Sequence, residues 1–230
     1  MSQPLRVLIV EDRPSDAEAL ALRLEEEGFE PRWVRVDAEA AYLAELAVAP
    51  DLILSDWTLP HFSGLRALRS VRGRGMDTPF VIVSGSVGEE TAIDAMHEGA
   101  DDYVLKDRLA RLGPAVRRAL DNRRSRDDRR RADAQLRQAA MVFESSNEAI
   151  TLTDVDGTIV AVNRAFTEIT GYVEAEVLGR NPSILQSGRQ DQGFYRDLWM
   201  TLAATGRWRG EIWNRRKNGE VYPEWLTISA

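Results

Sequence analysis

Short apolar runs that each end on a polar residue recur in the first half of the chain, and this pattern limits the fold most. They cover residues 5–10, 51–55, 79–83 and 102–105. Runs rich in Val, Ile and Leu without polar alternation are typical of strands buried on both faces. Helical patterns at 16–27, 38–48, 64–72 and 89–98 separate them. This alternation predicts a doubly wound α/β fold with a parallel sheet.

The residues that follow these runs carry the chemistry. Glu11 and Asp12 follow the first run, Asp56 the second, Ser84 the third and Lys106 the fourth. Ligands of such sheets bind at the carboxyl ends of the strands. Three carboxylates there would repel one another unless a hard cation such as Mg²⁺ lay among them, and a carboxylate can attack phosphorus. Solvated loop acids would explain any one of these residues, but the whole set predicts a phosphoryl-transfer site.

Four segments of this half resemble the receiver domain of bacterial response regulators. They are Val-Leu-Ile-Val-Glu-Asp (7–12), Ser-Asp-Trp-Thr-Leu-Pro (55–60), Val-Ser-Gly (83–85) and Gly-Ala-Asp-Asp-Tyr-Val-Leu-Lys (99–106). The resemblance covers residues 5 to about 122 and implies a flavodoxin-like, five-stranded parallel sheet. It also implies that a histidine kinase is the partner and that Asp56 is the phospho-acceptor.

The same resemblance implies roles for the other site residues. Asp12, Asp56 and the backbone carbonyl of Thr58 would bind Mg²⁺, and Glu11 would act largely through water. Lys106 would hold a phosphoryl oxygen. Ser84 would be the switch hydroxyl, and Tyr103 the aromatic side chain that changes rotamer with it.

One position departs from the family pattern, in which proline, often after a cis bond, usually follows the lysine. Here Asp107 follows Lys106. A cis bond before a residue other than proline costs about 3–4 kcal/mol. We therefore expect a trans bond and a reshaped loop after the last strand of the sheet.

Composition excludes several classes of function. The net charge of −7 argues against general nucleic-acid binding, and the absence of cysteine removes disulfide and thiol chemistry. No apolar run is long enough to span a membrane. We expect a cytoplasmic protein without membrane or nucleic-acid partners.

Residues 121–133 are almost entirely charged, with arginines and aspartates interleaved. Such residues form ion pairs along a helix, and neither proline nor glycine interrupts residues 115–146. We expect one long helix that continues the last receiver helix, with residues 123–141 as linker. A linker that pairs with its copy in a homodimer is favoured over a solvated single helix, and both over an RNA- or DNA-binding arm.

The rest of the chain, residues 142–230, resembles a PAS domain. Thr-Asp-Val-Asp-Gly (153–157), Val-Asn-Arg-Ala-Phe (162–166), Leu-Gly-Arg-Asn-Pro (178–182) and Asn-Arg-Arg-Lys-Asn-Gly-Glu (214–220) carry the resemblance. Strands at both ends with helices between them predict an α+β domain with an antiparallel sheet. The PAS family has a further strand after the one that ends at residues 227–230, so we expect this domain to lack its final strand and to precede an output domain. No effector motif, and so no output enzyme, is present in these residues.

Residue types that the PAS region lacks argue against two common cofactors of this family. A flavin–thiol adduct requires cysteine, and the two histidines, His61 and His97, both lie in the receiver, which removes the usual axial haem ligand. A cofactor cavity could be lined by four tryptophans, but a place in a core or a dimer interface is favoured for them: Trp199, Trp208, Trp213 and Trp225. The cofactor-binding residues are therefore unknown, and a ligand-free PAS domain is favoured.

Three functions remain open on the sequence. The first is a phosphorylation-controlled signalling module, which assists its own phosphorylation and dephosphorylation but contains no output enzyme. The second is a small-molecule sensor that uses the PAS domain as its input and the receiver as a dimerisation scaffold. The third is a phosphatase-like enzyme, which is disfavoured because Thr58 stands where a second acid would be needed.

Overall fold

The structure, a computed structural model, describes residues 3–85 and 89–230, without the side chains of residues 89–91. It divides into two compact units, Met1–Arg131 and Ala132–Ala230. In the described part of the chain, none of the helices combines the length and the apolar composition that a membrane crossing requires.

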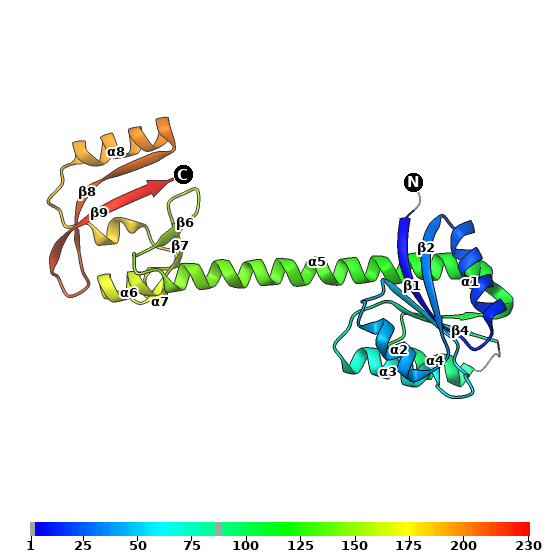
Figure 1. The fold of residues 1–230 in the computed structure, drawn as a ribbon. Helices are drawn as coiled ribbons and strands as arrows, with labels where there is room; N and C mark the ends of the chain where they lie inside the picture. Colours follow the sequence, from blue (N-terminus) through cyan, green and yellow to red (C-terminus); the bar gives the residue numbers. More distant parts are fainter. Residues whose placement is uncertain (1–2, 86–88) are drawn as a thin grey trace. The chain divides into compact units, whose positions relative to one another are not determined.

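The first unit is a five-stranded parallel sheet with the strand order β2-β1-β3-β4-β5 (Figure 1). This confirms the predicted fold class. The strands are β1 (Gln3–Val10), β2 (Phe29–Val36), β3 (Leu52–Ser55), β4 (Phe80–Ser84) and β5 (Asp102–Leu105). The helices are α1 (Pro14–Glu26), α2 (Glu39–Leu46), α3 (Gly64–Gly73), α4 (Glu89–His97) and the first part of α5 (Leu112–Ser145).

Alternating residues of the central strands build two cores, one on each face of the sheet. Leu5, Val7 and Ile9 of β1 pack with α1 and the start of α5, whereas Leu8 and Val10 pack with α2, α3 and α4. The central strands are therefore buried on both faces, as their unbroken apolar runs predicted. This packing fixes the strand ends that carry the polar residues.

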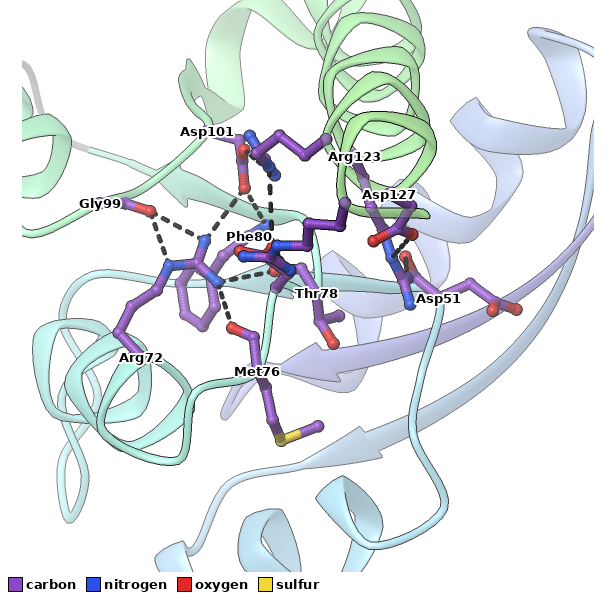
Figure 2. A network of polar contacts seen from close by, with 12 residues as sticks. Asp51, Arg72, Met76, Thr78, Phe80, Gly99, Asp101, Arg123 and Asp127 are labelled. Carbon is purple, nitrogen blue, oxygen red and sulfur yellow. Dashed lines mark hydrogen bonds and ion pairs between the residues drawn. The ribbon is translucent and has the colours of Figure 1, made fainter. Parts of the chain in front are cut away.

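Helix α5 begins in the first core, where Leu112, Val116 and Ala119 are buried. Farther along, Arg123, Arg126 and Arg130 lie three and four residues apart, so they share one side of the helix. We call these three residues the basic face of α5. They contact the edge of the sheet at which its strands begin. Arg123 Nη1 donates to Asp51 O at 3.3 Å (Figure 2). Arg126 Nη2 pairs with Asp101 Oδ1 at 3.5 Å, and Arg130 pairs with Asp77.

The second unit contains two antiparallel hairpins, which confirms the predicted antiparallel pairing. In the part of the chain described, they form two separate two-stranded sheets. The hairpins are β6 (Thr151–Thr153) with β7 (Ile159–Val162), and β8 (Arg207–Arg215) with β9 (Val221–Ser229). Between them lie α6 (Arg164–Thr170), α7 (Glu174–Val177), the 3-10 helix η2 (Pro182–Leu185) and α8 (Gln192–Thr205).

Asn163 connects the parts of this second unit. Its side chain is buried and accepts hydrogen bonds from the backbone N–H groups of Ile150 and Phe166, at 2.9 and 3.0 Å. Its amide donates to the carbonyls of Phe143, in the last turn of α5, and Glu148, at 3.0 and 2.9 Å. One asparagine thus caps α6 and holds the end of α5.

Candidate functional site

The predicted site residues come together at the edge of the parallel sheet where the strands end. Glu11 and Asp12 follow β1, Asp56 follows β3, and Lys106 follows β5. Because β1, β3, β4 and β5 are successive neighbours in the sheet, their carboxyl ends meet at one edge.

Lys106 is the cation at the centre of the site. Its Nζ lies 2.7 Å from Glu11 Oε2, 2.7 Å from Asp56 Oδ2 and 2.8 Å from Asp16 Oδ2. Burial lowers the pKa of this ammonium, but its hydrogen bonds to Asp16, Asp56 and Glu11 more than compensate and raise the pKa above its ordinary value. The side chain, 19% exposed, therefore stays protonated at physiological pH.

Three carboxylates form an acidic cluster beside Lys106. Glu11, Asp12 and Asp56 each offer an oxygen atom, and these atoms lie within 4.8 Å of one another. Glu11 is fully buried, and burial raises the pKa of its carboxyl even though Lys106 and the Arg13 amide oppose the shift. An all-oxygen donor set in which Asp12 is the more exposed member fits Mg²⁺, which retains water ligands.

The loop after β3 is held from both sides. Thr58 N donates to Asp56 Oδ1 at 3.1 Å, and Asp56 N donates to Val10 O at 2.8 Å. Gly64 begins α3 so close to this loop that an added Cβ would lie 2.3 Å from Asp56 O. A residue without a side chain is therefore required at position 64 to let α3 pack against the loop.

Ser84 lies on β4, the neighbour of β3, and Tyr103 lies on β5, the next strand in the sheet. Ser84 is buried at the end of β4 and pairs in register with Leu105, the residue before Lys106. Tyr103 pairs with Ile82 and packs, partly buried, against the core formed with α2, α3 and α4.

The segment after β5 agrees with the expectation drawn from Asp107. The described residues contain no cis peptide bond, so the bond from Lys106 to Asp107 is trans. The chain then forms the 3-10 helix η1 (Lys106–Arg111) and continues into α5.

Asp16 is a site residue that the sequence reasoning missed. It lies in the first turn of α1 rather than directly after a strand, so the strand-end pattern does not select it. The available signal was weaker: the helix after β1 starts at the sheet edge where the other acids lie. The hydrogen bond with Lys106 holds the pKa of the Asp16 carboxyl below its ordinary value.

The second unit has a more open surface feature. A hollow of about 320 Å³ lies between the end of α6 and the β8–β9 turn, and its lining includes Glu168, Thr170, Arg216 and Lys217. Trp199 and Trp225 are largely exposed, so these two do not belong to a core. The prediction that these two tryptophans lie in a dimer interface stays untested.

Comparison with known families separates the same two regions. The family model of the response regulator receiver domain matches residues 7–117, and that of the PAS domain matches residues 147–230. The chain therefore contains a response regulator receiver domain followed by a PAS domain.

Two curated relatives each match part of the chain. The chain is 35% identical over 126 residues to the cell cycle transcriptional regulator CtrA of Caulobacter vibrioides, a match that covers 53% of this chain and 54% of that protein. It is 38% identical over 81 residues to the nitrogen fixation regulatory protein of Klebsiella oxytoca, a match that covers 35% of this chain and 16% of that protein. The chain thus spans about half or less of the length of these relatives.

Among solved structures, a two-component response regulator of the LuxR family from Aurantimonas sp. SI85-9A1 is 28% identical, with a TM-score of 0.48. The match covers 52% of this chain and 87% of that one.

Proposed function

We propose that the receiver accepts a phosphoryl group on Asp56 from a histidine kinase and passes the change through α5 to the PAS domain. In this proposal residues 1–122 form the receiver, 123–141 the linker and 142–230 the PAS domain. The observation that carries the proposal is the Lys106 ammonium, 2.7 Å from Asp56 Oδ2 and beside an acidic cluster. A nucleophile, a cation for phosphoryl oxygens and a set of metal ligands are the parts that phosphoryl transfer needs.

In the transfer step a carboxylate oxygen of Asp56 forms a bond to phosphorus. The bond from phosphorus to the imidazole nitrogen of the donor breaks, and its electron pair stays on that nitrogen. Lys106 and Ser84 donate hydrogen bonds to the phosphoryl oxygens. The Thr58 amide, which donates to Asp56 Oδ1, orients the carboxylate before the transfer.

Mg²⁺ is the cofactor that this donor set supports. Asp12, Asp56 and the Thr58 carbonyl would hold the ion, with Glu11 acting through water. When bound, the ion neutralises part of the charge on the transferring phosphoryl group. The ion would also offset the repulsion among the three clustered carboxylates, of which Glu11 and Asp56 are buried.

Phosphorylation then biases a two-state change within the receiver. The Ser84 side chain moves toward the phosphoryl group, and Tyr103 changes rotamer with it. The resulting change in the receiver surface is transmitted to α5. From α5 the change passes to the PAS domain and on to an output domain or partner. The linker and the PAS domain also form the homodimer contacts in this proposal.

The decisive experiment treats the full chain with acetyl phosphate and Mg²⁺ and follows its intact mass and its light scattering. We expect one added phosphoryl group on the wild type, none on Asp56→Asn, and none after chelation of Mg²⁺. Asp107→Asn, which removes an exposed carboxylate next to Lys106, is the matched control and keeps the modification. Equal incorporation into the Asp56→Asn variant would refute the assignment, and an unchanged oligomer would remove the dimerisation step.

A further inference from the structure

Asp16 contacts Lys106 but has no part in the phosphoryl transfer described above. Its Oδ2 lies 2.8 Å from Lys106 Nζ, across 90 positions of the sequence. It does not belong to the acidic cluster of Glu11, Asp12 and Asp56. The contact therefore needs a reason of its own.

The number of donors on the lysine provides that reason. An ammonium group has three N–H donors, and here three carboxylates lie within hydrogen-bond distance of Lys106 Nζ. Two of the partners, Glu11 and Asp56, belong to the acidic cluster that would face the metal ion and the phosphoryl group, so their surroundings change during the reaction. Asp16 lies outside that cluster and has neither role in the proposed reaction.

Asp16 is also held rigidly enough to position another residue. Pro14 opens α1, and Asp16 N donates to Arg13 O at 3.1 Å. The next residue, Ala17, is fully buried in the core, which fixes the first turn of the helix. The Asp16 side chain itself is only 25% exposed. A carboxylate in the first turn is further favoured by the helix dipole.

We propose that Asp16 is a positioning residue that holds the Lys106 ammonium beside Asp56 before and after the phosphoryl group arrives. The inference rests on the proposed function for its consequence, but the contact itself can be tested without phosphorylation. A lysine side chain has four rotatable bonds, and without a fixed partner its head group samples positions that do not face the phosphoryl oxygens.

The contact can be observed directly because the chain has only two lysines, Lys106 and Lys217. In the full chain carrying ¹⁵N-labelled lysine, an ammonium proton signal is visible only when hydrogen bonds slow its exchange with water. Lys217→Arg assigns the remaining signal to Lys106. We expect this signal in the wild type, its loss in Asp16→Ala, and an intermediate exchange rate in Asp16→Asn, which keeps an acceptor oxygen but not the charge.

Loss of the Asp16 carboxylate should change the maximal phosphorylation rate and the half-saturating concentration of the phosphodonor in different ways. With acetyl phosphate and Mg²⁺, Asp16→Ala should lower the maximal phosphorylation rate roughly tenfold, the effect of losing one charge-assisted hydrogen bond to the lysine. The half-saturating concentration of acetyl phosphate should fall, because one negative charge near the anionic donor is gone. A loss of folded protein alone would lower the rate but leave this concentration unchanged.

The matched control is Glu18→Gln, which removes the same charge from an exposed position two residues farther along α1. It should leave the lysine signal and both kinetic constants unchanged. An Asp16→Ala variant with the wild-type ammonium signal, or with the kinetics of Glu18→Gln, would overturn the positioning role. If instead the wild type takes no phosphoryl group, the proposed function fails while the ammonium signal still decides whether Asp16 holds Lys106.

Discussion

Asp101 lies at the start of β5 and joins three parts of the receiver (Figure 2). Its Oδ2 accepts from Phe80 N at 2.9 Å and pairs with Arg72 Nη2 at 3.1 Å. Its Oδ1 faces Arg126 of the basic face of α5 at 3.5 Å. With a side chain only 8% exposed, Asp101 compensates cations from α3 and α5 at the same time. Replacing it by alanine should therefore loosen α5 as well as the sheet edge.

The size of the effect follows from what each partner would lose. Arg72 keeps the carbonyls of Met76, Thr78 and Gly99 as acceptors, so it is not left without partners. Arg126, 41% exposed, keeps Asp77 Oδ2 as an ion-pair partner at 4.0 Å. The main cost is the Phe80 N–H at the beginning of a buried strand, about 1–3 kcal/mol for an unsatisfied group. With the lost ion pairs, we expect Asp101→Ala to lower the free energy of unfolding by about 2–4 kcal/mol.

Hydrogen–deuterium exchange in urea, read by peptide mass spectrometry, measures this loss in the receiver separately from the PAS domain. Peptides from β4, β5 and the segment 119–131 of α5 should lose protection together. The control is Asp128→Ala, because Asp128 is 75% exposed and pairs with Arg131 of its own helix at 3.6 Å. It should change stability by less than about 0.5 kcal/mol. An Asp101→Ala receiver as stable as the control would refute the reasoning.

Three further predictions concern other contacts. Gly64→Ala should destabilise the receiver by about 1–3 kcal/mol and slow phosphorylation, because the added Cβ would clash with Asp56 O. The control, Gly73→Ala, has open space around its Cβ and should be neutral or stabilising in thermal unfolding. Asn163→Asp should lower the free energy of unfolding of the PAS domain, measured in urea, by about 3 kcal/mol, because a buried carboxylate would face two carbonyl oxygens. An unchanged free energy of unfolding would contradict the capping role. Mg²⁺ at one hundred times its Kd should stabilise the receiver by about 2.7 kcal/mol, and Asp12→Asn should require a higher concentration; equal titrations would exclude Asp12 as a ligand.

The central strands could be predicted from the sequence because burial on both faces leaves only apolar residues in them. Strand β2 does not follow this rule. It pairs with β1 along its whole length, yet most of its residues are exposed or half-buried, and it contains Pro31. At the edge of a sheet one side has no strand partner, so polar residues and proline are tolerated. The residue pattern alone therefore did not reveal this strand.

Site residues were predictable to the extent that they directly follow a strand. Glu11, Asp12, Asp56 and Lys106 do, and the structure brings them together. Asp16 could not be found in this way, because its position depends on how α1 turns back over the sheet edge. The same holds for the arginines of α5, where helical spacing predicts a shared side but not which surface that side contacts.

The two ends of β5 connect the site with the basic face of α5. Asp101 precedes this four-residue strand, and Lys106 follows it. Four residues of strand span only about 13 Å, so a shift of Lys106 toward a phosphoryl group has a short, rigid route to the Asp101–Arg126 pair. We therefore expect phosphorylation to change the exchange protection of segment 119–131, and Arg126→Ala to reduce that change. Arg129→Ala, at an exposed position of the same helix, should leave it intact. If phosphorylation alters this segment equally in the wild type and in Arg126→Ala, the signal reaches α5 by another route, and the Asp101–Arg126 pair is a structural contact only.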